Sequence, residues 1–310
     1  MLLRSPKHGF ENKQGLENSA DKLLHTGFST LYGTELRVLL QPNEIVLNLL
    51  KRDFMDGFRA KVVHSQTVTL ADVPKSNDQQ AIAPQLLNKL IEALQKPVWK
   101  GAAPVVVLSN YFMRYLVLDW NEDIKSKQER SAYLKHSFLQ HFGETSKDWH
   151  LREYLATYGK SAIASGVSQT LLRELEAAFY AANLKAKAIH PMLMLVANHA
   201  LHYLKNHKLA ANFWLACVEN NRLTLALIDE GSWKFVCNLA AEHEVGKQIG
   251  TLIQRESIFD QTFPTFPIMT IGCGDVLIND SHIIKLEDEN QGIENQAREF
   301  AYTIQPKWAA

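Results

Sequence analysis

One order of secondary-structure elements occurs twice in this chain, and that repetition constrains the fold more than any single motif. Residues 35–94 have the pattern of three strands followed by a helix, and the apolar run at 104–108 (PVVVL) is typical of a short strand covered on both faces. From about residue 209 the same order returns. Strands followed by alternating strands and helices indicate a mixed sheet with helices packed on it. The sequence therefore predicts two similar α/β lobes.

Apolar spacing sets the elements expected in the first half. Strands alternate apolar and polar side chains or are apolar throughout, whereas helices repeat apolar residues at spacings of three and four. The expected strands are 35–40, 44–50, 59–71, 104–108, 113–120, 150–156, 161–167 and 185–190. The expected helices are 79–94, 129–142, 168–184 and 192–206. Ser168 is a suitable N-cap for the third helix, and Pro191 directly precedes the fourth.

The second half is expected to begin with three strands. The first two are joined by Asn220-Asn221, a tight-turn dipeptide that tolerates positive φ. The expected strands are 213–219, 222–228, 232–239, 266–272 and 281–286, with a helix at 240–255.

The two ends of the chain have no strong periodicity. Residues 1–33 mix polar residues with scattered Leu and Phe and are expected to form a mobile tail, with a short helix at 19–24. The stretch 287–310 is polar and then loosely apolar; we expect it to pack back on a lobe, with a docking peptide for another chain as the alternative. The predicted domains are a first lobe at 34–208 and a second at 209–310.

Charge and composition exclude several classes of function. The chain has 33 Lys and Arg against 33 Asp and Glu, so its formal net charge is zero. Broad nucleic-acid binding and electrostatic docking on membranes both need a positive excess. No apolar run reaches the roughly 20 residues of a membrane-spanning helix, which argues against direct insertion. Three cysteines without a C-x-x-C pair indicate reduced thiols in a cytoplasm.

Four stretches of the chain carry a resemblance to a known superfamily. They are PVVVLSNYFMRYLVLDW (104–120), ERSAYLKHSFLQHF (129–142), DWHLREYLATYGKSAIASGVS (148–168) and SQTLLRELEAAFYAANLKAKAIHPMLMLVANHAL (168–201). Their order resembles the actin-like ATPases, which have two ribonuclease-H-like lobes, and more narrowly the PilM family of pilus assembly proteins and the cytoplasmic part of GspL proteins. The resemblance implies mixed sheets flanked by helices and a small inserted subdomain at about 121–167. It also implies that one lobe grips a short peptide from a membrane-anchored partner.

The residues at the expected nucleotide site depart from the superfamily. Actin-like ATPases hold phosphates in two hairpin turns that carry Gly and Asp, because the backbone must approach the phosphate and a carboxylate must organise Mg²⁺. Here the first turn is Gln41-Pro42-Asn43, without Gly or a carboxylate, and Pro42 has no N–H. The second turn offers Glu219, which could serve a metal, but no Gly. Gly272 and Gly274 are the remaining glycine-rich element, although two glycines after a strand also suit a plain turn.

Two functions remain open at this point. The preferred one is a non-catalytic actin-fold scaffold, a pseudo-ATPase without cofactor or metal, that binds partner subunits of a type IV pilus or type II secretion-like assembly. It would be cytoplasmic and held at the inner membrane through a partner. The alternative is an ATPase or kinase of the same superfamily that binds ATP and Mg²⁺ at Glu219, Gly272 and Gly274.

Other polar clusters have simpler interpretations. His199 and His202 are one helical turn apart and could share a zinc ion with His207, but no carboxylate lies among them and Lys205 and Lys208 repel a cation, which favours a surface cluster. The carboxylates of Asp119, Glu122 and Asp123 are expected in a solvated loop. The cysteines are expected to be inert thiols in or beside strands: Cys217, Cys237 and Cys273.

Overall fold

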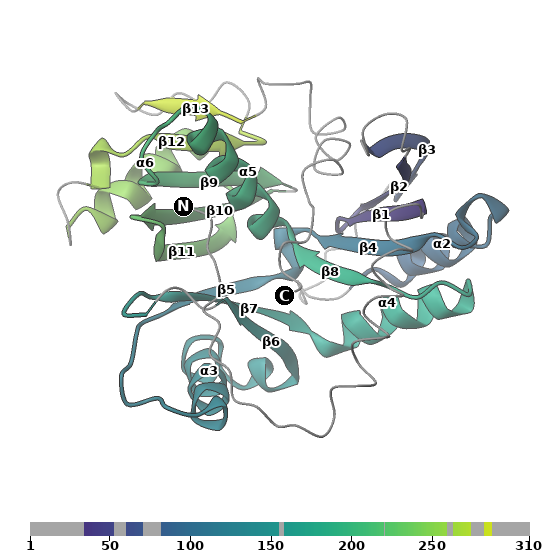
Figure 1. The fold of residues 1–310 in the computed structure, drawn as a ribbon, viewed down its shortest axis with the longest axis horizontal. Coiled ribbons are helices and arrows are strands. Elements are labelled where there is room, and N and C mark those ends of the chain that lie inside the picture. The colour runs from purple at the N-terminus through teal and green to yellow at the C-terminus, as the bar shows by residue number, and fades with distance from the viewer. Residues whose placement is uncertain are drawn as a thin grey trace.

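The first lobe is built on a five-stranded mixed sheet of order β3-β2-β1-β4-β8. The computed structural model describes residues 34–52, 60–70, 82–154, 158–219, 221–258, 263–273 and 282–286. The strands of this sheet are β1 (Thr34–Leu40), β2 (Glu44–Arg52), β3 (Ala60–Thr69), β4 (Ala103–Leu108) and β8 (Ala188–Pro191). The first three form the predicted antiparallel meander, and β4 and β8 run parallel to β1. Helices α2 (Pro84–Leu94) and α4 (Gln169–Ala181) pack against each other beside this sheet (Figure 1).

The second lobe repeats this topology in the order β11-β10-β9-β12-β13. Its strands are β9 (Phe213–Glu219), β10 (Arg222–Asp229), β11 (Ser232–Ala240), β12 (Ile268–Ile271) and β13 (Ile283–Lys285). Again the first three are antiparallel neighbours, and β12 and β13 are parallel to β9. Helix α6 (Val245–Glu256) packs Ile249 and Ile253 into an apolar cluster with Trp214 and Leu225 of the sheet. The prediction of two α/β units with mixed sheets is confirmed.

A small third sheet, of order β5-β7-β6, is inserted between β4 and α4 of the first lobe. It consists of β5 (Arg114–Leu118), β6 (Trp149–Tyr154) and β7 (Ala162–Ser168), and helix α3 (Lys127–Phe142) covers one of its faces. The sequence predicted an insert from about residue 121. The sheet begins earlier, because β5 pairs with β7 along its whole length, from Arg114 opposite Gly166 to Leu118 opposite Ala162.

Gly166 of β7 is needed for the packing between this sheet and α3. A Cβ atom at this position would lie 2.8 Å from Cε1 of Phe138 and 3.0 Å from side-chain atoms of both Leu151 and Trp149. Helix α3 itself begins with a capping box, in which Ser126 Oγ accepts from the Glu129 N–H and the Glu129 carboxylate accepts from the Ser126 N–H. The insert is therefore an ordered, well-packed subdomain.

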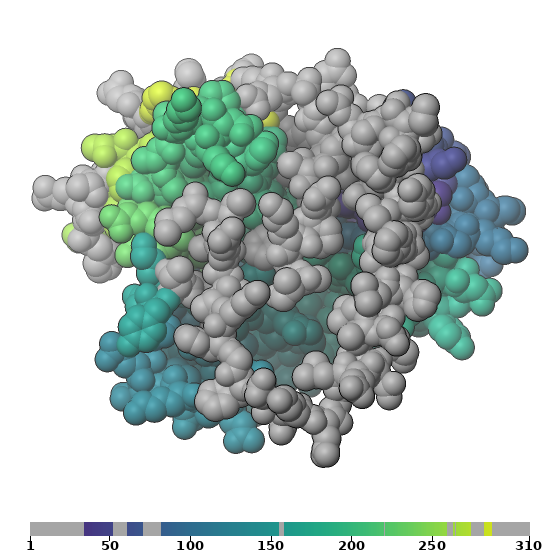
Figure 2. Space-filling view, in the orientation of Figure 1, coloured from purple at the N-terminus to yellow at the C-terminus, as the bar shows by residue number. Residues whose placement is uncertain are grey.

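The two lobes share one apolar core. Leu36 of β1, Val196 of α5 (Met192–Asn206), Leu215 of β9 and Met269 of β12 belong to a single buried cluster. Helix α5 follows β8 and packs on β9, so it joins the lobes. Strand β5 of the inserted sheet contacts β11, and blue and teal atoms of the inserted subdomain lie below the green atoms of the second lobe (Figure 2). Within the described ranges, no helix combines the length and the apolar character needed to cross a membrane.

Short 3₁₀ turns complete the described elements. They are η1 (Pro97–Trp99), η2 (Asn110–Phe112), η3 (Glu144–Asp148) and η4 (Phe263–Thr265). The second of them, η2, directly follows the buried strand β4 and enters the region between the lobes. It carries Asn110, which contacts several of the polar groups described next.

Candidate functional site at the junction of the lobes

A set of polar side chains, the junction network, connects the first lobe, the inserted sheet and the second lobe. Its members are Asn110, Tyr115, Glu219, Arg222 and Asn238. At the end of β4 the Ser109 hydroxyl accepts from the Tyr111 N–H at 3.1 Å, which turns the chain into η2 and places Asn110 at the junction.

Asn110 is fully buried, and its side chain contacts three other elements. Its Oδ1 accepts from the Tyr115 hydroxyl of β5 at 2.6 Å and from the Leu193 N–H of α5 at 3.0 Å. Its Nδ2 lies 3.6 Å from Sγ of Cys217 on β9. Since a buried amide must have its hydrogen-bonding groups satisfied, these partners fix the relative position of both lobes and the insert.

Asn238 of β11 forms the second link between the lobes. Its Nδ2 donates to the carbonyl oxygens of Asn110, at 2.7 Å, and of Met113, at 3.0 Å. Its Oδ1 accepts from Nε of Arg222 at 3.1 Å and from Nη2 of the same guanidinium at 2.9 Å. Arg222, which is 6% exposed, thereby orients the amide that holds η2.

Glu219, at the end of β9, points its carboxyl group into this junction. One oxygen accepts from the backbone N–H of Asn110, and the other, Oε2, is buried without a hydrogen-bond partner. Loss of solvation raises the pKa of Glu219 to about 7, although the Asn110 N–H and the Ser109 hydroxyl act in the opposite direction. A carboxyl group in these surroundings is neutral over much of the acidic range.

The first of the two turns expected to hold phosphates is closed by its own hydrogen bonds. The Gln41 N–H donates to the Glu44 carbonyl at 2.9 Å, and the Asn43 carbonyl accepts from the Leu70 N–H at 2.9 Å. Pro42 is buried and has no N–H. Neither Gln41 nor Pro42 can therefore donate a backbone hydrogen bond to a phosphate.

The other predicted site residues are only partly placed. In the second turn Asn221 has φ of +60°, as expected for a residue that tolerates the left-handed region. Gly272 directly follows β12 with φ of +70°, a conformation that suits a turn. Gly274 lies outside the described residues. Contact of Glu219, Gly272 or Gly274 with a nucleotide stays a prediction.

The remaining polar clusters lie at the surface or in strands. The ring of His207 stacks on Tyr203 with centroids 4.0 Å apart, and His202 Nε2 is 3.0 Å from Nδ2 of Asn206. In the part of the chain that the structure describes, no three His, Cys, Asp or Glu side chains are grouped so that they could hold a metal ion. The acidic turn at Asp119 is exposed, and the cysteines are free thiols, with Cys217 buried.

Comparison with solved structures identifies the architecture. A protein of Bacteroides thetaiotaomicron, described as having an actin-like ATPase fold and unknown function, aligns with a TM-score of 0.56 and 9% identity, over 87% of this chain and 97% of the other. The chain has the actin-like ATPase fold. Two further structures agree: the cytoplasmic domain of EpsL, an inner membrane component of the type II secretion system of Vibrio cholerae, and the PilM–PilN type IV pilus biogenesis complex.

These two alignments also cover most of each chain. The EpsL domain has a TM-score of 0.56 at 10% identity, over 88% of this chain and 96% of the other. The chain of the PilM–PilN complex has a TM-score of 0.55 at 10% identity, over 86% of this chain and 94% of the other. No protein-family model and no curated protein sequence matches this chain. At such identities the actin-like fold is shared, while residues and activity have to be argued from this chain itself.

Sequence reasoning missed most of the junction network. It singled out Glu219 as a metal or nucleotide contact, whereas the carboxyl group accepts from Asn110 of the other lobe. A usable signal was present: Ser109 and Asn110 are polar residues directly after the wholly apolar strand β4, where a buried polar pair needs partners.

Proposed function

We propose that this protein is a non-catalytic actin-fold scaffold that binds other protein subunits. The observation that carries the proposal is that two of the groups expected to hold phosphate or Mg²⁺ already accept or donate a hydrogen bond within the chain. The Gln41 N–H is used inside its hairpin, and the Glu219 carboxyl group accepts from Asn110 across the junction. Freeing Glu219 for a nucleotide means breaking its hydrogen bond with Asn110, which links the two lobes.

The energetics favour the scaffold over an ATPase or kinase. Opening the junction breaks the hydrogen bonds of Asn110 and Asn238, and each such bond contributes about 0.5–1.5 kcal/mol net. It also separates the apolar cluster that spans both lobes. The lobes, taken as 34–208 and 209–310, are therefore proposed to act as one rigid platform.

The assembly that this platform serves is proposed from the fold relatives. The EpsL domain belongs to an inner membrane component of a secretion system, and the PilM chain is part of a complex with PilN in pilus biogenesis. By analogy, this chain binds subunits of a type IV pilus or type II secretion-like assembly, in the cytoplasm, and reaches the inner membrane through a membrane-anchored partner.

The test is recovery of the tagged full-length chain from its own host after cross-linking in intact cells. We expect a membrane-anchored subunit of a pilus or secretion assembly to be recovered with the chain from the membrane fraction. Recovery of the chain without such a subunit, together with ATP hydrolysis by the purified protein, would overturn the proposal and support the alternative.

A further inference from the structure

A partner segment can join a sheet only where an edge strand is long and accessible, because the added strand pairs with unpaired backbone groups. Among the described residues the three sheets end in six edge strands, namely β3, β8, β11, β13, β5 and β6. Their lengths and surroundings differ enough to separate them.

Four of these edges are unsuitable. Strand β8 has four residues and ends at Pro191, and β13 has three residues. Strands β5 and β11 lie next to each other, and Asn238 of β11 donates to the carbonyl of Met113, directly before β5. An incoming strand would have to separate β5 from β11 and break the junction network.

The edge of β3 is long but protected. Its pairing with β2 is irregular: Leu49 lies opposite His64 and Leu50 opposite Val62, so Val63 is an extra residue in a bulge. Bulges and lysines on edge strands are recognised devices against strand addition. Here Lys89 Nζ also donates to the Thr69 carbonyl at 2.7 Å.

Among the described residues, strand β6 has neither a bulge nor a lysine, and its charged residues are Arg152 and Glu153. Its six residues pair with β7 without a register shift, from Trp149 opposite Ser168 to Tyr154 opposite Ile163. On one face Trp149 and Leu151 pack in the cluster that contains Phe138 of α3, so the strand is held in place. Six residues span about 20 Å, which suits a short extended segment.

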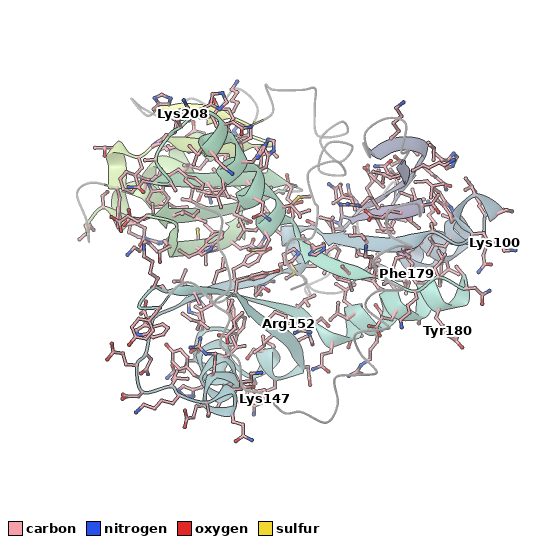
Figure 3. The ribbon with its side chains drawn as sticks, viewed as in Figure 1. Lys100, Lys147, Arg152, Phe179, Tyr180 and Lys208 are labelled. Carbon is pink, nitrogen blue, oxygen red and sulfur yellow. The ribbon has the colours of Figure 1, made fainter. Side chains whose placement is uncertain are left out.

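The basic side chains on one face of β6 favour an acidic ligand. Arg152 is exposed, and its Nε lies 3.0 Å from Nε2 of His150 on the same face of β6. The exposed Asp148 directly precedes the strand, and Lys147 comes just before it, with its side chain 60% exposed and a weak surface pair to Glu144. Figure 3 places Lys147 and Arg152 on the inserted subdomain, away from Lys100 and Lys208. Glu153 lies on the opposite face, toward Arg130.

We propose that the outer edge of β6 receives an extended acidic segment of the partner subunit as a fourth strand of the inserted sheet. This inference rests on the proposed function and names the surface that serves it. Backbone hydrogen bonds along β6 supply most of the affinity, and Lys147, His150 and Arg152 select for carboxylates.

The experiment uses short random peptides selected for binding to the full-length chain, followed by hydrogen exchange of the chain with and without each peptide. We expect the selected peptides to be rich in Asp and Glu and to slow exchange of the amides of residues 149–154. The double variant Lys147→Glu, Arg152→Glu should bind them about three- to tenfold more weakly, whereas the matched control Lys100→Glu, Lys208→Glu should bind them unchanged.

Three results would overturn the proposal: no peptide selected above background, protection at another element, or equal binding by the two double variants. Protection at β3, for example, would assign docking to that edge instead. Each of these results leaves the proposed function standing if a pilus or secretion subunit is still recovered with the chain, so the two failures are distinguishable.

Discussion

The Glu219 carboxyl group should make the stability of this protein fall as the pH rises. Its pKa is raised from an ordinary 4.5 to about 7 by burial, so the folded chain holds this proton more tightly than the unfolded chain does. The stability that comes from this raised pKa is fully present at pH values below the pKa of the group in the unfolded chain. It is lost as the pH rises through the pKa of the group in the folded chain. The relevant window therefore extends from about pH 4.5 to about pH 7.

The size of the effect follows from these two pKa values. Each pH unit between them is worth about 1.4 kcal/mol, so this one group changes the free energy of unfolding by about 3 kcal/mol across the window. Glu219→Gln keeps the shape of the side chain and an acceptor for the Asn110 N–H but cannot ionise. It places an amide where Oε2 has no partner, which adds a constant cost of about 1–3 kcal/mol at every pH.

The assay is denaturant unfolding of wild type and Glu219→Gln from about pH 5 to about pH 8. The free energy of unfolding of the variant minus that of wild type should increase with pH by about 3 kcal/mol. Glu122→Gln, which changes an exposed carboxylate, is the matched control and should show no such trend. Parallel pH profiles for wild type and Glu219→Gln would refute the argument that this carboxyl group is held neutral by burial.

Two further predictions concern packing. Asn110→Ala should lower the free energy of unfolding by about 2–4 kcal/mol in denaturant unfolding, because it leaves the Tyr115 hydroxyl and the Leu193 N–H without their acceptor. A loss below about 1 kcal/mol would contradict a structural role for this amide. Gly166→Ala should lower the free energy of unfolding by about 1–3 kcal/mol, because the added methyl group would lie 2.8 Å from Phe138. A melting temperature equal to that of wild type would show that the insert repacks freely.

Local patterns in the sequence were sufficient for most of the secondary structure. Ser168 caps α4 as predicted, by accepting from the Leu171 N–H, and α5 begins directly after Pro191. Boundaries failed where pairing continued further than the pattern indicated. The helix expected from residue 240 begins at Val245, because Ala240 is still paired with Arg222 at the end of β11.

The junction network could not be predicted in the same way. Asn110 is 109 residues from Glu219 and 128 residues from Asn238, and no local periodicity brings such residues together. Only the packing of the two lobes on α5 creates their contact. The missing N–H of Pro42 could be read from the sequence, because it is a property of the residue itself; poor binding of phosphate at this turn stays a prediction.

The central claim is that the junction between the lobes does not hold a nucleotide, and thermal unfolding of the full-length chain with and without millimolar ATP and Mg²⁺ tests it most directly. A ligand that binds only the folded state must raise the melting temperature, by an amount that grows with its concentration. We predict the same melting temperature with and without nucleotide. A saturable rise that Glu219→Gln abolishes would contradict the account.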